Sequence, residues 1–247
     1  MTAPHIAHAI WQTLRISVPT IWQGLTGTLT PERCDQRLLQ WSGSIVRRAS
    51  IDLQVDGLEH AVAGESFVLM SNHQSLYDVP VIYQALQRRI RMVAKKELFQ
   101  VPIWGRAMRR AGFISLDRTN RERSRETLLA SADVLHDGTS IWIAPEGTRS
   151  RTGELGPFRK GGFHLALQSG ARILPITVIG TRKVLPAKGA RITDGCSVRV
   201  VVHPPIDPKL YGEERREQLI EAVRNSIASA LPPPSLFPPP RGGVGED

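Results

Sequence analysis

From residue 51 onward, short apolar runs typical of strands alternate with longer segments that have helical periodicity. Such alternation is typical of a largely parallel sheet covered by helices on both faces. We therefore expect an α/β fold with a mostly parallel, mixed central sheet flanked by helices. The expected strands lie near 51–55, 66–71, 90–94, 112–116, 139–143, 173–179 and 197–202, and the expected helices near 79–87, 101–110, 121–136, 160–169 and 210–230.

The first 49 residues have a different pattern, which predicts two helices before the α/β domain. Apolar residues recur at helical spacing over 5–22, and Pro19 is expected to interrupt this first helix. Thr30, Pro31 and Glu32 predict the start of a second helix, because they suit its cap, its first position and its first turn. We expect an amphipathic helical hairpin.

Aromatic and basic residues are concentrated in this hairpin. Trp11, Trp22 and Trp41 lie in it, and such a combination on an amphipathic helix favours docking at the headgroup boundary of a membrane. Two alternatives remain open at this point, since the apolar side could instead pack on the protein's own core or on a second copy. The arginines concerned are Arg15, Arg33, Arg37, Arg47 and Arg48.

Chain length and composition favour one α/β domain over residues 50–231. The chain has 247 residues, of which 41% are hydrophobic, enough to bury one substantial core. Residues 232–247 are rich in proline and glycine and cannot bury enough apolar surface to fold. We expect them to form a disordered tail.

The charge balance favours anionic partners. The chain has 32 Lys and Arg against 23 Asp and Glu, a net charge of +9, and twelve of the basic residues lie within 88–125. We expect this cluster to form a cationic face. Charge alone does not distinguish anionic lipid from nucleic acid, although no nucleic-acid-binding module accompanies it.

The chain has two cysteines, Cys34 and Cys196, which are far apart and lack the spacing of metal ligands. This favours a reducing compartment and predicts neither a disulfide framework nor a zinc site. No apolar run of eighteen residues and no signal-peptide pattern occurs. We expect a protein that is neither exported nor membrane-spanning.

A histidine and a carboxylate, His73 and Asp78, follow the apolar strand expected near 66–71. Ligands usually bind at the carboxyl ends of the strands in such sheets. A neutral imidazole can take a proton from a hydroxyl group if a carboxylate orients it and stabilises the imidazolium. The pair therefore favours a general-base site, although Asp78 could simply cap the helix that follows.

Two further strand ends carry groups that suit an anionic substrate. Glu146, Gly147 and Arg149 follow the strand near 139–143, and Arg118 follows the strand near 112–116. Arginine binds phosphate through paired hydrogen bonds, and glycine lets the backbone approach a ligand closely. The alternative for the Glu146 turn is a surface loop with an incidental ion pair. No nucleophile is evident, which favours attack by a hydroxyl of the substrate.

Taken together, these segments resemble the glycerolipid acyltransferase family, the group that includes the PlsC-like 1-acylglycerol-3-phosphate acyltransferases. Residues 72–78 match the family's Asn-His-x-x-x-x-Asp motif, and 145–150 match its Pro-Glu-Gly-Thr-Arg-Ser motif. Residues 112–118 resemble the glycine-led second motif, and 95–98 resemble the basic segment before it. The strand containing Pro175 falls where the fourth motif belongs, so the resemblance covers roughly 50–205.

The resemblance implies acyl transfer in phospholipid biosynthesis, with His73 as general base and Asp78 as its partner. The expected reaction moves a fatty acyl group from acyl-CoA or acyl carrier protein to the free hydroxyl of lysophosphatidate, giving phosphatidate. It requires no metal and no other cofactor. The implied location is the cytoplasmic face of the membrane, in a peripheral or monotopic position. The implied substrate-binding residues are Lys96, Arg118, Glu146, Gly147, Thr148 and Arg149.

The chain departs from the family pattern at two positions. Ala144 stands where the family often has Phe, and Ser115 interrupts a motif that is normally apolar. These departures affect the packing of the acyl chain and leave the choice of acceptor open. Glycerol 3-phosphate or a lysolipid without phosphate are the alternative acceptors, and a non-enzymatic lipid-binding protein with the same fold is the alternative function.

Overall fold

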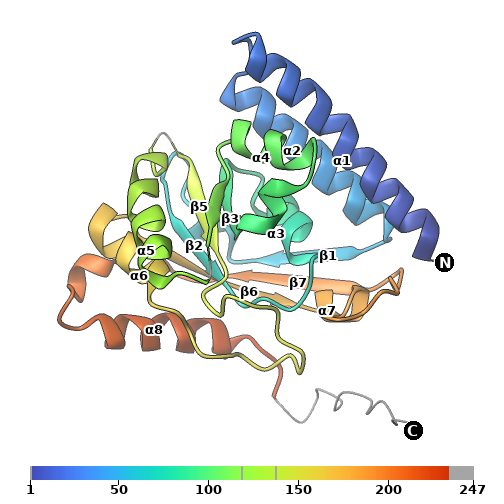
Figure 1. The fold of residues 1–247 in the computed structure, drawn as a ribbon. Coiled ribbons are helices and arrows are strands. Elements are labelled where there is room, and N and C mark those ends of the chain that lie inside the picture. The colour runs from blue at the N-terminus through green and yellow to red at the C-terminus, as the bar shows by residue number, and fades with distance from the viewer. Residues whose placement is uncertain (1, 118, 137, 234–247) are drawn as a thin grey trace, which may run out of the picture.

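A seven-stranded sheet forms the centre of the protein in a computed structural model that describes residues 2–117, 119–136 and 138–233 (Figure 1). The strand order is β1-β7-β6-β2-β5-β3-β4, and every neighbouring pair is parallel except β6 and β7. The expected mixed, mostly parallel sheet is therefore confirmed. The strands are β1 (Asp52–Asp56), β2 (Val68–Ser71), β3 (Ile90–Lys95), β4 (Ile114–Leu116), β5 (Ser140–Ile143), β6 (Ile173–Ile179) and β7 (Ser197–Val202).

Helices cover both faces of this sheet, because successive side chains of a strand point to opposite faces. Leu69 and neighbouring apolar residues pack against α2 and α3 on one face, whereas Val68 and Met70 pack against α5, α6 and α8 on the other. The helices are α1 (Thr2–Leu25), α2 (Pro31–Arg48), α3 (Asp78–Leu86), α4 (Trp104–Arg110), α5 (Arg121–Ala130), α6 (Gly161–Ser169), α7 (Thr181–Val184) and α8 (Arg216–Ser229).

Several helix boundaries differ from those expected. The interruption at Pro19 is wrong, since α1 continues through it to Leu25. Proline removes one backbone hydrogen bond, but polar contacts along the hairpin hold this part of α1, including those from Arg37 to Thr20 Oγ1 and Gln23 Oε1. Helix α8 begins six residues later than expected, after a separate 3₁₀ turn at Pro208–Leu210.

The α1–α2 hairpin, blue in Figure 1, packs beside α4 and is fastened to the α/β domain through α2. Arg91 of β3 is buried and donates to Asp35 of α2 at 2.6 Å, and Arg89 pairs with Glu32 at 2.6 Å. Elsewhere in the basic segment, Lys96 forms an ion pair with Asp117. The basic residues predicted to form one cationic face are thus partly used in contacts within the protein.

Two sequence predictions fall outside the described residues. The structure describes neither Arg118 nor residues 234–247, which make up most of the expected tail. Within the described residues, no helix is long and apolar enough to cross a bilayer.

Candidate active site

His73 and Asp78 form a close pair on the turn between β2 and α3. Nδ1 of His73 lies 2.6 Å from Oδ2 of Asp78, and the backbone N–H groups of Gln74 and Ser75 donate to the same oxygen at 2.7 and 2.9 Å. Asp78 is fully buried, while the His73 side chain is 15% exposed. The carboxylate therefore fixes one ring nitrogen and leaves Nε2 available to exchange a proton.

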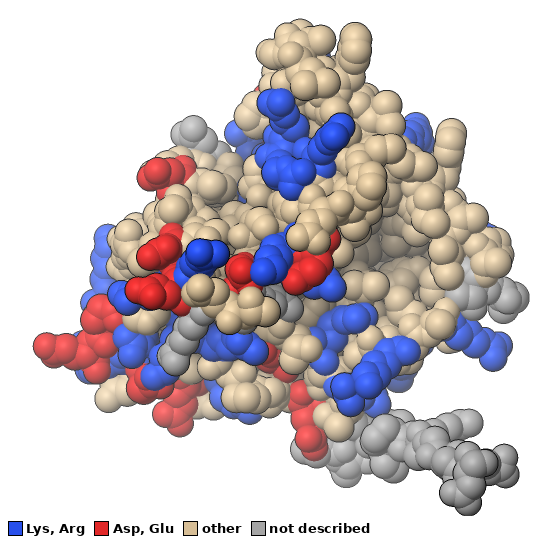
Figure 2. Space-filling view, viewed as in Figure 1, with Lys and Arg blue, Asp and Glu red and all other residues tan. Residues whose placement is uncertain are grey.

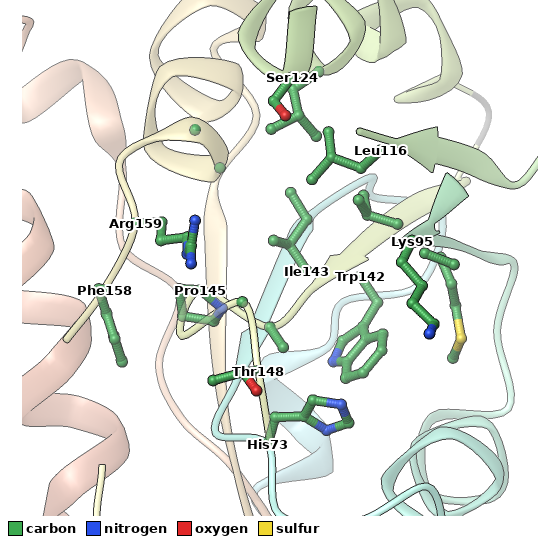
Figure 3. A pocket seen from close by; sticks show the side chains of 18 of the residues that line it. His73, Lys95, Leu116, Ser124, Trp142, Ile143, Pro145, Thr148, Phe158 and Arg159 are labelled. Atoms are coloured by element: carbon green, nitrogen blue, oxygen red, sulfur yellow. The ribbon is translucent and has the colours of Figure 1, made fainter. Parts of the chain in front are cut away.

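The turn that carries His73 is fixed at both sides by long-range hydrogen bonds. Asn72 donates to Val178 O at 2.8 Å and accepts from Val178 N at 2.7 Å, which joins the end of β2 to β6. The carbonyl of His73 accepts from Ser150 N at 2.7 Å. Its ring meets the indole of Trp142 edge-on, with centroids 5.8 Å apart (Figure 3). The imidazole is thus held on a rigid support.

Glu146 is buried, and both of its carboxylate oxygens contact backbone groups. Oε1 accepts from His73 N at 2.9 Å, and Oε2 accepts from Gly156 N at 2.8 Å. Burial raises the pKa of this carboxyl, although the two N–H groups act in the opposite direction. Glu146 therefore ties the histidine turn to the 145–156 loop, and its predicted contact with the acceptor stays a prediction.

Gly147, Thr148 and Arg149 line a cavity together with His73. Gly147 has φ +72°, and a Cβ atom there would lie 2.6 Å from Nε of Arg159. The positive φ favours glycine here, and a Cβ atom would in addition displace the Arg159 side chain. In Figure 3, Thr148 and His73 lie at the same end of the cavity.

The cavity has a volume of about 1130 Å³ and lies at the carboxyl ends of β3, β4 and β5. This is where ligands bind in open α/β sheets, and the volume suits a sizeable ligand. Apolar side chains form much of its wall, among them Met92 and Val93. Leu116, Trp142 and Ile143 are further examples, which Figure 3 labels. Basic side chains also line it, namely Lys95, Arg125, Arg149, Arg159 and Lys160.

Sequence reasoning selected Lys96, whereas the described lining of the cavity contains its neighbour Lys95. Lys96 Nζ donates to Asp117 Oδ2 at 2.7 Å, and this bond, with those from Thr119, holds the pKa of the Asp117 carboxyl well below its usual range. The last residue of β3 and the next residue point in different directions, which accounts for the difference.

Arg159 is a second cavity residue that sequence reasoning missed. Its backbone N–H donates to Pro145 O at 2.8 Å, so the 145–150 loop and the segment before α6 lie together. The available signal was the basic pair Arg159-Lys160 directly before the Gly161-Gly162 start of α6. Alone, such a pair is equally typical of a solvated surface.

The fold and sequence agree with those of known proteins. The crystal structure of the 1-acyl-sn-glycerophosphate (LPA) acyltransferase PlsC from Thermotoga maritima matches with a TM-score of 0.70 at 24% identity, covering 91% of this chain and 97% of that one. Chloroplastic 1-acyl-sn-glycerol-3-phosphate acyltransferase of Brassica napus is 34% identical over 178 residues, covering 72% of this chain and 50% of the relative.

The alpha 1-acyl-sn-glycerol-3-phosphate acyltransferase of Homo sapiens is 32% identical over 186 residues, which cover 73% of this chain and 64% of the human protein. The chain thus spans about half the length of its plant relatives and somewhat more of the human one. A family model described as Acyltransferase matches residues 52–179, more than half of the chain and the part that contains His73, Asp78 and Glu146. The chain therefore belongs to the acyltransferase family.

Proposed function

We propose that this protein transfers a fatty acyl group from acyl-CoA or acyl carrier protein to the free hydroxyl of lysophosphatidate, giving phosphatidate. The observation that carries the proposal is the 2.6 Å pair of His73 and Asp78 at the edge of a cavity with apolar walls and basic side chains. The names of the curated relatives support it. Neither a metal nor a cofactor is needed for this chemistry.

In the proposed mechanism, His73 acts as general base through Nε2. The acceptor hydroxyl gives its proton to Nε2 while its oxygen attacks the thioester carbonyl, and Asp78 stabilises the imidazolium that forms. The tetrahedral intermediate then breaks its carbon–sulfur bond. The imidazolium returns the proton to the leaving sulfur, so that the ester and a free thiol are released and the base is restored.

The acceptor phosphate is proposed to lie against the guanidinium groups of Arg149 and Arg159. Both line the cavity, and neither has an ion pair with another described residue. Guanidinium groups bind phosphate through two parallel hydrogen bonds. Lys96 is a weaker candidate because it already pairs with Asp117. Arg118, the other candidate, lies outside the described residues.

Replacing Arg149 by alanine is expected to lower kcat/KM for lysophosphatidate by about 10- to 100-fold, because a hydrogen-bonded ion pair to the phosphate is lost. Activity on monoacylglycerol, which lacks phosphate, should change much less. Arg151→Ala is the matched control, since Arg151 is exposed on the same loop outside the described cavity lining. Equal losses on both acceptors would argue against a phosphate contact.

The outer side of α1 is proposed to dock on the cytoplasmic face of the membrane. This helix turns its polar residues inward, with Ser17 and Thr20 buried and His5 bonded to Asp194 at 2.7 Å. Most of its large apolar residues face outward, although Ala9 and Ile16 pack against the core. This is the reverse of a helix that packs on a core through its apolar side. Figure 2 shows mainly uncharged side chains on the hairpin and basic ones below it. The exposed residues are Ile6, Ile10, Trp11, Leu14, Val18, Trp22 and Leu25.

The two helices of the hairpin therefore differ in what covers their apolar sides. Helix α2 packs on the core through Leu38, Ile45 and Val46, as the alternative expected. In α1, by contrast, Trp11 is 64% exposed and Trp22 is 67% exposed. Transfer of such side chains to the headgroup boundary is favourable, since indole suits a site that is apolar at one end and polar at the other.

Replacing Trp11 and Trp22 together by serine is expected to weaken binding to vesicles at least about tenfold, because two large apolar side chains no longer leave water. Co-sedimentation with phosphatidylcholine vesicles containing phosphatidylglycerol measures this. Leu210→Ser, at a residue 68% exposed in a different part of the chain, is the control. Unchanged vesicle binding, together with a wild-type dimer that the double variant cannot form, would assign the surface to self-association.

The activity itself is tested by thiol release from acyl-CoA and from acyl carrier protein. Lysophosphatidate, glycerol 3-phosphate and monoacylglycerol are compared as acceptors. We expect release to depend on lysophosphatidate. Preference for glycerol 3-phosphate or monoacylglycerol would move the proposal to that acceptor, and no release with any acceptor would favour a lipid-binding protein without turnover.

A further inference from the structure

Asp78 has a fourth hydrogen-bond donor that comes from a distant part of the chain. Thr181 Oγ1 donates to Asp78 Oδ1 at 2.5 Å, and both residues are fully buried. The other carboxylate oxygen, Oδ2, accepts from His73 and from two backbone N–H groups. Thr181 therefore holds the oxygen that does not face the imidazole.

The sheet topology explains why these residues meet although they are 103 positions apart. Strands β2 and β6 are parallel neighbours, so the turns that follow them lie at the same edge of the sheet. A second bond joins the same turns, because Ser75 Oγ donates to Leu185 O at 2.7 Å. Gly180 permits this arrangement, since its φ is +97° and a Cβ atom would lie 2.4 Å from Ser197 O.

We infer that Thr181 is a positioning residue for the general base, acting through Asp78. Without its hydroxyl, Oδ1 of Asp78 would be a buried acceptor with no donor among the described residues, and the carboxylate could rotate toward another donor. The plane of the carboxylate would then no longer be fixed against Nδ1 of His73. Thr181 lies two residues beyond the part of the chain that the family model matches, and it is outside the described lining of the cavity.

This inference rests on the proposed function and deepens it. A residue that acts only on the orientation of Asp78 affects the chemical step and leaves substrate binding unchanged. Valine has nearly the shape of threonine without the hydroxyl, whereas serine keeps the hydroxyl without the methyl. The two substitutions at Thr181 therefore separate the hydrogen bond from packing.

The test compares wild type, Thr181→Val and Thr181→Ser in the thiol-release assay. We expect Thr181→Val to lower kcat by about 10- to 100-fold, the effect of losing one hydrogen bond to a charged group, with KM for both substrates unchanged. Thr181→Ser should recover most of this loss. Equal losses in the two variants, or wild-type kcat in Thr181→Val, would overturn the inference.

A second measurement does not depend on turnover. The 2.6 Å bond to Asp78 is expected to give the proton on Nδ1 of His73 a downfield NMR signal, which would be identified by its loss in His73→Ala. We expect this signal to move in Thr181→Val and to stay near its wild-type position in Thr181→Ser. An unmoved signal in folded Thr181→Val would overturn the inference even if wild type shows no acyltransferase activity, so the failure of the proposed function is recognised separately.

Discussion

Replacing His73 by alanine is expected to lower turnover by about 10²–10⁴-fold, the usual contribution of a general base. The variant should remain folded, because the backbone bonds of residue 73 to Glu146 and Ser150 do not involve the imidazole. The side chain also lies partly open to the cavity, so its removal leaves no closed void in the core. Thiol release in the presence of lysophosphatidate measures the loss.

His136→Ala provides the control for the loss of an imidazole, since His136 is exposed and outside the described lining of the cavity. It should retain wild-type turnover. Folding of both variants is checked by thermal unfolding. Near-normal turnover in folded His73→Ala would show that His73 is not the general base. The proposed mechanism would then keep only the binding of the substrates in the cavity.

Asp78→Asn is expected to reduce turnover by a similar factor of about 10²–10⁴ and also to destabilise the fold. A neutral amide cannot stabilise the imidazolium as a carboxylate does. It also offers one acceptor oxygen in place of two, whereas Asp78 accepts from Gln74 N, Ser75 N and the hydroxyl of Thr181. One or more of these buried donors would lose its partner.

The loss of buried hydrogen bonds predicts a decrease of about 1–3 kcal/mol in the free energy of unfolding. Denaturant unfolding measures this decrease independently of the kinetic assay. Asp133→Asn, at an exposed aspartate, is the matched control and should change neither quantity. A stable Asp78→Asn variant with full activity would show that the charge of Asp78 has no part in the reaction.

Local sequence patterns were sufficient for the positions of the strands and for the His73–Asp78 pair, but not for the order of the strands in the sheet. Each buried strand is a short apolar run, and its two faces follow from the two-residue period of a strand. The histidine and the aspartate are five residues apart on one turn, so their meeting is a local property of the chain. For the same reason, the capping at Thr30 and Pro31 was correctly predicted.

The remaining features depend on contacts between distant segments. Thr181 gave no signal because its role requires knowing that β2 and β6 are neighbours. The same applies to Arg159, which reaches the cavity only because its segment packs on the 145–150 loop. At Pro19, tertiary contacts maintain a helix that local propensity disfavours. Sequence periodicity carries no information on these long-range arrangements.

The anchoring of α2 has a consequence for how the cavity meets a bilayer. Asp35 of α2 is joined to Arg91 of β3, and β3 ends at Lys95 in the cavity wall. A membrane-docked α1 would therefore fix the height and tilt of His73 relative to the lipid surface. A flexible tether would leave both free to vary. Lipid acceptors would then reach the base by diffusing in two dimensions to an entrance held at constant depth.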